Sequence, residues 1–256
     1  MTGMNYLVDG ERAIISLGGR CDYGCRYCYT YEPGFKGFAK KTPAEIIPTL
    51  QELPKEVKLV QCGYDNEFFQ EEDEAVELIK AIAESGLNVT FSTKKDLSLE
   101  TIVSLRSIHE QMQHFQFMVG CVSLLGFETA RILEPNAPDP YKRIETIRRL
   151  YFANIPTLVY LRPLIPMIPD EEIEEVFAQT TKSCNGYVIG KMIFDERNAD
   201  MFNLPRTNKK IMTWSKDHRE WYEFSDPRAK ELAERPNVFL HRSDALSAIV
   251  NDREEE

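Results

Sequence analysis

The chain has 256 residues and a formal net charge of −10, because 41 acidic residues outnumber 31 basic ones. With 43% hydrophobic residues, this length fits one large domain or two small ones around a substantial core. The negative charge argues against a broad nucleic-acid-binding face. No apolar run approaches the roughly 18–20 residues of a membrane span. Residues 1–12 lack the pattern of a signal peptide, so we expect a cytoplasmic protein without membrane contact.

Apolar runs of strand length recur along the chain, nearly continuous rather than alternating, as expected for strands buried on both faces. Segments with the period of a helix lie between them. The predicted strands are residues 13–17, 57–61, 89–92, 115–119, 157–161 and 187–193, and the predicted helices are 42–53, 72–85, 98–112, 144–150 and 170–177. Strands that alternate with helices predict a parallel sheet with right-handed crossovers. We interpret the pattern as an α/β fold, a partial (βα)6 TIM-like barrel.

The first predicted helix has the clearest boundary signals. Thr42 is followed by Pro43 and, three residues on, by Glu45. This is the pattern of a capping box with proline at the first helical position. Pro48 interrupts the helical pattern and predicts a break or a kink.

Residues after about 195 lose the alternation of strands and helices. We therefore predict a barrel at 1–195 and a short C-terminal α/β extension at 196–256 that closes the open side of the barrel, with two short helices and a strand at 238–240. Within the extension, basic residues are interleaved with Trp214 and Trp221. This composition fits either phosphate contact or a solvated helix face whose tryptophans anchor it to the core. The basic residues are Arg206, Lys209, Lys210, Lys216, His218 and Arg219.

Three of the six cysteines, Cys21, Cys25 and Cys28, stand on one short loop in the spacing C-x3-C-x2-C. The loop follows the first predicted strand, so we expect it at the C-terminal mouth of the barrel, where such folds build their sites. Three thiolates can hold a four-iron cluster by three irons, which leaves the fourth iron open. Zinc is the alternative, but a tetrahedral structural site needs a fourth ligand, and the four histidines are remote in sequence.

This cysteine motif, on the loop after the first strand of a partial barrel, resembles that of the radical S-adenosylmethionine superfamily over residues 13–195. The resemblance implies a [4Fe–4S] cluster whose fourth iron binds the amine and carboxylate of S-adenosylmethionine. It also implies that an electron from a small donor of the flavodoxin or ferredoxin type cleaves the cofactor to a 5′-deoxyadenosyl radical, which abstracts a substrate hydrogen atom. The protein would orient the cofactor and exclude water and oxidants.

The same resemblance implies cofactor contacts at the strand ends. The sequence "QCGYDNE" takes the place of the family's Gly-Gly-Glu motif, so Asp65 or Glu67 is expected to receive the methionyl amine, with Gly63 giving access to the backbone. The departure from the motif leaves the choice between the two carboxylates open. The other implied contacts are Tyr27 to the adenine, Lys94 to the cofactor carboxylate, Ser123 to the ribose, and Arg162 and Lys191 to the cofactor or an anionic substrate. Thr93, next to Lys94, is also expected to bind the cofactor. The alternative for these strand-end residues is a solvated rim.

A longer stretch resembles the branch of the family that contains spore photoproduct lyase. The matching residues are Ser123, Leu133–Pro138, Arg143 and Pro163–Pro166. In that lyase a tyrosine–cysteine set returns a hydrogen atom to the product, and the expected equivalents here are Tyr27, Tyr29 and Cys62. We expect Cys62 to face the barrel mouth, with a small core residue as the alternative.

Three functions remain open from the sequence. The first is a radical enzyme that abstracts a hydrogen atom from an unidentified small molecule or peptide, for example as a lyase or an epimerase. The second is repair of a nucleic-acid lesion, and the third is an iron–sulfur or zinc binding module without catalysis. The acidic charge favours the first function over the second.

Overall fold

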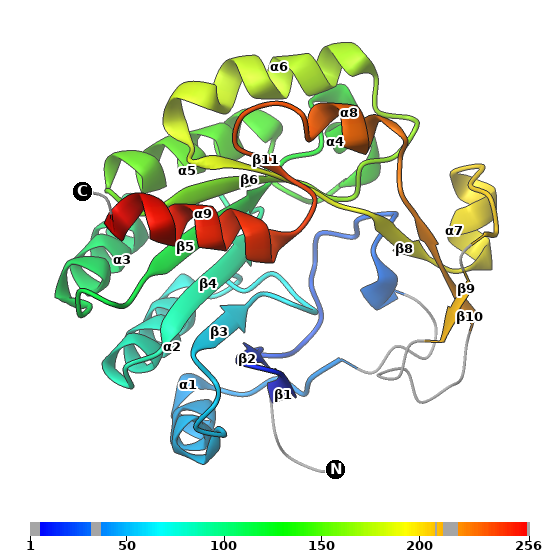
Figure 1. Ribbon diagram of the computed structural model, residues 1–256. Coiled ribbons are helices and arrows are strands. Elements are labelled where there is room, and N and C mark those ends of the chain that lie inside the picture. Colours follow the sequence, from blue (N-terminus) through cyan, green and yellow to red (C-terminus); the bar gives the residue numbers. More distant parts are fainter. Residues whose placement is uncertain (1–5, 32–36, 208, 212–219, 255–256) are drawn as a thin grey trace.

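An eight-stranded open sheet forms the centre of the computed structural model (Figure 1). The structure describes residues 6–31, 37–207, 209–211 and 220–254. The strands lie in the order β1 (Tyr6–Asp9), β2 (Arg12–Ile15), β3 (Leu59–Cys62), β4 (Asn88–Thr93), β5 (Met118–Ser123), β6 (Thr157–Leu161), β7 (Gly186–Ile189) and β11 (Val238–Phe239). Neighbouring strands are parallel except β1, which forms an antiparallel hairpin with β2. This mostly parallel α/β sheet confirms the predicted fold class.

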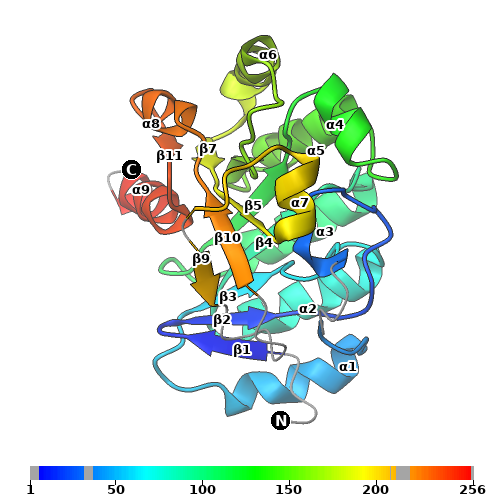
Figure 2. The same cartoon turned by 90° about the vertical axis from the view of Figure 1, so that its right-hand side faces the viewer.

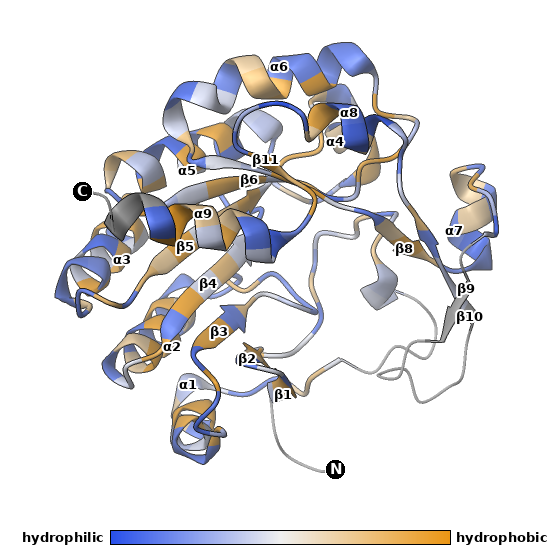
Figure 3. Cartoon of the chain, viewed as in Figure 1, coloured by the Kyte–Doolittle hydropathy of each residue, from blue (hydrophilic) through white to orange (hydrophobic). Residues whose placement is uncertain are grey.

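Helices connect the parallel strands and cover the outer face of the sheet. These helices are α2 (Glu72–Glu84), α3 (Leu99–Gln111), α5 (Pro140–Phe152) and α6 (Asp170–Thr180), and a shorter helix, α4 (Glu128–Leu133), precedes α5. Each turns an apolar stripe toward the strands; in α2 the stripe is Ala75, Leu78, Ile79 and Ile82. Coloured by hydropathy, the strands are predominantly hydrophobic and the helices are mixed (Figure 3).

The inner face of the sheet is filled by α9 (Arg242–Glu254), which lies across the strands from α2, α3 and α5 (Figure 2). A side chain at Gly120 would meet Phe91 and Leu150 on the outer face, whereas its neighbours in β5 face α9, because side chains alternate along a strand. The Arg242 guanidinium donates a hydrogen bond to the Thr90 hydroxyl at 3.2 Å. The inner-face core contains Val119, Cys121, Leu158, Tyr160, Val188, Ala245, Leu246 and Ile249.

The first predicted helix is split where its proline predicts a break. Helix α1 (Pro43–Ile46) is followed directly by a 3-10 helix, η2 (Ile47–Glu52), with Pro48 in its first turn. The Glu45 carboxylate accepts a hydrogen bond from the backbone N–H of Thr42 at 2.9 Å, which confirms the capping box.

The predicted strand at 115–119 begins later, as β5 at Met118. The side-chain amide of Gln116 donates hydrogen bonds to the carbonyls of Ala83 at 3.0 Å and Leu87 at 3.1 Å. Gln116 therefore ties the connection between α3 and β5 to the end of α2 and the loop after it, and is not part of the strand.

The predicted strand at 187–193 is wrong as a single strand, because it belongs to two sheets. β7 ends at Ile189, and β8 (Met192–Phe194) starts a separate three-stranded antiparallel sheet with the order β8-β10-β9. Between them the backbone N–H of Gly190 donates to the Leu161 carbonyl at 3.0 Å. The apolar run in the sequence is continuous across this break, so hydrophobicity alone did not reveal it.

The C-terminal segment contains α7 (Glu196–Met201), β9 (Lys209–Ile211), β10 (Glu220–Phe224), α8 (Arg228–Leu232), β11 and α9. The described part of the basic stretch is not the solvated helix face considered above. Lys209 and Lys210 belong to β9, and Trp221 belongs to β10. Trp221 is buried, in agreement with an anchoring role. Four residues of the stretch lie outside the described residues: Trp214, Lys216, His218 and Arg219.

The division into 1–195 and 196–256 remains a prediction, although β11 pairs with β7 of the main sheet. Among the helices that the structure describes, none combines the length and the hydrophobicity that crossing a bilayer requires.

Candidate active site

A cavity of about 260 Å³ opens at the carboxyl ends of the parallel strands. Strand ends from β3 to β6, the loop after β2 and the start of β8 contribute to its wall. The structure thereby brings together every predicted site residue except Cys62; those that line the cavity are Cys21, Cys25, Tyr27, Cys28, Tyr29, Gly63, Asp65, Glu67, Thr93, Lys94, Ser123, Arg162 and Lys191. Their roles remain predictions. Thr93 and Ser123 are buried, whereas Arg162 and Lys191 are exposed, so the solvated-rim alternative stands for those two.

The cysteine loop leaves β2 through a tight passage. Gly18 has φ +68°, and a Cβ there would lie 2.0 Å from the Ala39 carbonyl oxygen, so only glycine fits. Beyond it the backbone N–H of Cys28 donates to the Cys25 carbonyl at 3.0 Å, and the short 3-10 helix η1 (Tyr29–Tyr31) follows. This turn places all three thiols on the cavity wall.

The cysteine thiols fit a cluster better than a single ion. All three are free, and among the described residues no three His, Cys, Asp or Glu side chains converge in the way that one metal ion requires. Thiolates that bind different irons of a cubane do not have to meet at one point. Burial raises the pKa of Cys25 to about 12, against the opposing charge of Lys94, and burial also raises the pKa of Cys21. Metal binding must therefore displace protons from these thiols.

Asp65 and Glu67 are both buried acids with protein hydrogen bonds. Glu67 accepts from the Thr93 hydroxyl at 2.6 Å and from the backbone N–H of Lys94 at 2.9 Å. Asp65 accepts from the Ser16 hydroxyl and from the backbone N–H of Phe38 at 2.7 Å. Burial raises the pKa of each carboxyl, and these hydrogen bonds oppose the rise. Both acids line the cavity, so either one suits an ammonium group.

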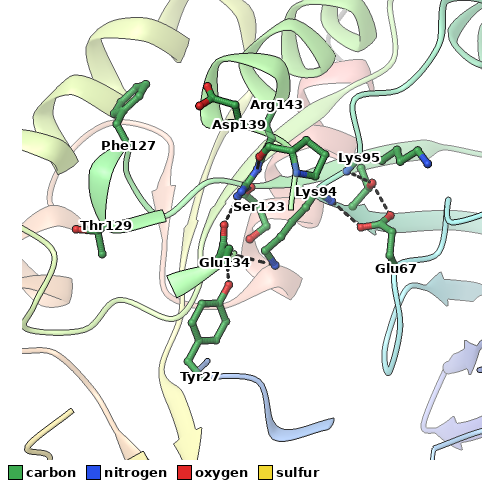
Figure 4. Close-up of polar contacts among 12 residues, drawn as sticks. Tyr27, Glu67, Lys94, Lys95, Ser123, Phe127, Thr129, Glu134, Asp139 and Arg143 are labelled. Carbon is green, nitrogen blue, oxygen red and sulfur yellow. Dashed lines mark hydrogen bonds and ion pairs between the residues drawn. The ribbon is translucent and has the colours of Figure 1, made fainter. Parts of the chain in front are cut away.

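The sequence did not single out the charged network behind the cysteine loop (Figure 4). The Lys94 amine lies 3.8 Å from a carboxylate oxygen of Glu134. The same carboxylate accepts hydrogen bonds from the Tyr27 hydroxyl and the Arg143 guanidinium. Glu134 and Arg143 belong to the stretch whose resemblance is described above, but no local pattern indicates that they meet Tyr27.

Ser123 and Arg162 leave polar groups uncommitted at the cavity. The Ser123 Oγ is buried and has no hydrogen-bond partner among the described residues. Arg162 has no ion pair within that part of the chain, and its side chain lies over Gly190, where a Cβ would come within 2.0 Å of the arginine Cγ. Lys191, by contrast, forms an ion pair with Glu223 of β10 at 2.8 Å.

The structure does not bring Cys62 to the cavity. In the parallel ladder Cys62 lies beside Phe91, so both side chains face the outer, helix-covered side of the sheet. The thiol is fully buried in the large core. Tyr29 does line the cavity, and its hydroxyl donates to the Tyr64 carbonyl at 2.7 Å.

The comparisons with known proteins agree with this geometry. The sequence profile of the Radical SAM superfamily matches residues 15–179. Spore photoproduct lyase complexed with dinucleoside spore photoproduct superposes with a TM-score of 0.63 at 16% identity, over 86% of this chain and 73% of that chain. SuiB of Streptococcus suis bound to S-adenosylmethionine superposes with a TM-score of 0.54 at 14% identity, over 71% of this chain and 40% of that chain.

The chain thus spans about two fifths of the length of the SuiB structures that it matches. At these identities the superpositions show a shared fold. Among curated proteins, no sequence matches the chain.

Proposed function

The chain belongs to the Radical SAM superfamily, and we propose that it abstracts a hydrogen atom from a small molecule or a peptide. Membership implies a [4Fe–4S] cluster and S-adenosylmethionine as cofactors. The observation that carries the proposal is the shared cavity, where three free thiols, two buried acids and the guanidinium of Arg162 converge at the carboxyl end of the sheet. When bound, the two cofactors supply a carbon-centred radical.

The residues of this chain would bind and orient the cofactors. Cys21, Cys25 and Cys28 would give up their protons and hold the cluster. Asp65 or Glu67 would accept hydrogen bonds from the methionyl ammonium, and the charge of each acid suits that role. The further contacts in this proposal are Gly63 and Tyr27 through the backbone, Thr93 and Lys94 at the methionyl carboxylate, and Ser123 at a ribose hydroxyl.

The substrate side of the cavity would be formed by Arg162, Lys191 and β8. Arg162 forms no ion pair with any other residue that the structure describes, so it would bind an anionic group of the cofactor or of the substrate, whereas Lys191 is engaged with Glu223. Met192 and Ile193, from the second sheet, add apolar wall. This wall would help to exclude water from the reacting atoms.

A small molecule or peptide is the better substrate class for a chain of net charge −10. SuiB, which shares the fold, has been crystallised bound to its precursor peptide SuiA. The structures of spore photoproduct lyase with a dinucleoside support the second candidate, repair of a nucleic-acid lesion. A steep fall of DNA affinity with salt would favour that candidate.

The proposal includes an electron donor of the flavodoxin or ferredoxin type, since a cluster of this kind must be reduced before it reacts. It also includes a cytoplasmic location, because cluster thiols require a reducing compartment. Anaerobic reconstitution followed by measurement of 5′-deoxyadenosine and methionine tests the activity. If the reduced protein with bound cluster makes neither compound, the third alternative, a binding module without catalysis, replaces the proposal.

A further inference from the structure

A buried carboxylate links the cysteine loop to the rest of the cavity wall. Glu134 stands just after α4 and its side chain is fully buried. The carboxylate accepts hydrogen bonds from the Tyr27 hydroxyl and the Arg143 guanidinium, and one of its oxygens lies 3.8 Å from the Lys94 amine. Figure 4 shows the three side chains converging on Glu134 from three separate elements.

Backbone contacts around Glu134 hold the same loop. The Leu133 carbonyl accepts a hydrogen bond from the backbone N–H of Arg26 at 2.8 Å, and the backbone N–H of Asn136 donates to the Tyr23 carbonyl at 3.2 Å. The Asn136 side-chain amide also donates to the Asp22 carbonyl at 3.0 Å. These bonds attach the loop at Asp22 and Tyr23 before Cys25 and at Arg26 after it, so the loop cannot shift without breaking them.

Arg143 extends the link to the end of β5. Its guanidinium donates to the Ser123 carbonyl at 3.3 Å and to the Pro138 carbonyl at 2.8 Å, besides its ion pair with Glu134. A buried charge pair stays stable only when its remaining hydrogen-bonding groups are satisfied. Among the described residues, neither Glu134 nor Arg143 has a buried side-chain nitrogen or oxygen atom without a hydrogen-bond partner. Glu134 therefore joins the cysteine loop, the end of β4 and the end of β5 in one network.

Glu134 does not itself line the cavity, so its effect must pass through its neighbours. Tyr27 stands directly before Cys28, and Lys94 lines the cavity wall. The Lys94 side chain is only 18% exposed, so its amine has little freedom to find another partner. Outer partners of this kind fix the orientation of the groups that they bind, and their loss weakens metal binding.

We propose that Glu134 is a positioning residue that holds the cysteine loop and the Lys94 amine in fixed relation to each other. The inference rests on the proposed function of the loop as the ligand set of a cluster. Through Tyr27, Glu134 restrains Cys25 and Cys28; through its charge, it aims Lys94 at the cavity. Glu134 exerts both restraints without lining the cavity, so neither requires it to contact a cofactor.

The test uses Glu134→Gln and Tyr27→Phe in the full chain, with Glu172→Gln as the matched control. Glu172 is also a carboxylate with backbone partners: it accepts from the N–H groups of Phe127 at 2.7 Å and Thr129 at 3.2 Å. Within the part of the chain that the structure describes, it makes no hydrogen bond to the cysteine loop, so its loss should affect stability alone. Each protein is reconstituted without oxygen. The measurements are iron content, the rate of iron loss to a chelator, the paramagnetic resonance spectrum of the reduced cluster with and without S-adenosylmethionine, and unfolding by urea.

Glu134→Gln and Tyr27→Phe should each lose iron roughly 10- to 100-fold faster than the unmodified chain, the factor by which loss of an outer-shell partner typically lowers metal affinity. Glu134→Gln should also reduce the spectral change caused by S-adenosylmethionine, because Lys94 loses its charged partner, whereas Tyr27→Phe should retain this change. The control should show a lower unfolding midpoint with normal iron retention.

A folded Glu134→Gln protein with unchanged iron retention and spectra would overturn the positioning role while leaving the cluster intact. If Glu134→Gln does not fold, Tyr27→Phe decides by the same iron measurement, since it removes only one hydroxyl. An unmodified chain that binds no iron would instead overturn the proposed function, and the positioning role with it.

Discussion

The Arg162 side chain occupies the space that any side chain at Gly190 would need. A Cβ at Gly190 would come within 2.0 Å of Cγ and 2.1 Å of Nε of the arginine. The glycine at the turn between β7 and β8 thus lets the guanidinium lie along the cavity wall. Neither residue alone reveals this relation, because Arg162 follows the end of β6 and Gly190 follows the end of β7, the neighbouring strand.

Gly190→Ala should destabilise the chain by about 1–3 kcal/mol through overpacking. The same substitution in an Arg162→Ala background should cost much less, because the colliding atoms are gone. Urea unfolding of the two single variants and the double variant gives the coupling energy. Equal costs in both backgrounds would mean that the arginine moves aside freely.

The cysteine spacing predicts about four irons per chain after anaerobic reconstitution, the content of one cubane. Cys21→Ala, Cys25→Ala and Cys28→Ala should each abolish formation of 5′-deoxyadenosine, whereas Cys184→Ala, at a half-buried cysteine outside the loop, should not. Iron analysis and product chromatography check both statements. Stoichiometric zinc without iron would contradict the cluster.

Lys94→Ala and Ser123→Ala should weaken S-adenosylmethionine binding without changing the absorption of the cluster. Loss of one hydrogen bond to a charged group costs about 1.5–3 kcal/mol, or roughly ten- to a hundredfold in affinity; this range applies to Lys94, and the neutral Ser123 bond should lie at or below its lower end. Lys95→Ala is the control, because this neighbouring lysine points to the Gln70 carbonyl at 3.5 Å and does not line the cavity. Unchanged affinity in both test variants would show that neither Lys94 nor Ser123 contributes to S-adenosylmethionine binding.

Gly63→Ala should be more destabilising than Gly86→Ala. Both glycines have positive φ, +83° and +80°, so both substitutions carry the same backbone strain of about 1–3 kcal/mol. Only at Gly63 would the new Cβ also collide, at 2.6 Å from the Ser92 carbonyl oxygen, whereas nothing lies within 4 Å at Gly86. Urea unfolding compares the two. Equal losses would show that the end of β3 has room to adjust.

Cys62→Ala should leave the products of the reaction unchanged and lower the free energy of unfolding by about 1 kcal/mol, as for a small core residue. Cys62→Ser should be worse, because it buries a hydroxyl on the apolar side of the sheet at a cost of roughly 1–3 kcal/mol if it finds no partner. Product analysis and unfolding of both variants test this placement. Altered products from a folded Cys62→Ala protein would restore the hydrogen-return role expected from the sequence.

The sequence predicted the cavity well because parallel strands impose it. Carboxyl ends of neighbouring parallel strands meet at one edge of the sheet, so polar residues that end successive apolar runs must come together there. The loop after the first strand joins them for the same reason. Lys94 and Ser123 could therefore be placed without knowing a single tertiary contact.

Two features could not be predicted by that argument. Cys62 lies on the opposite face from the one expected, because side chains alternate along a strand and a shift of one residue reverses their direction. The bond between Tyr27 and Glu134 joins residues 107 positions apart. No local periodicity encodes such a contact, although the buried charge of Glu134 demands a partner.

The position of α9 has a consequence for the order of folding. Arg242 at its start bonds to Thr90, 152 positions earlier in the chain, and its apolar side chains complete the inner-face core with β5, β6 and β7. Contacts of such long sequence separation form slowly, because the loop between them must close first. We expect a transient species in which the outer helices are already protected from hydrogen exchange while the inner face still binds a hydrophobic dye. If the backbone amides on both faces of the sheet become protected from hydrogen exchange at the same time, α9 docks together with the outer helices and not after them.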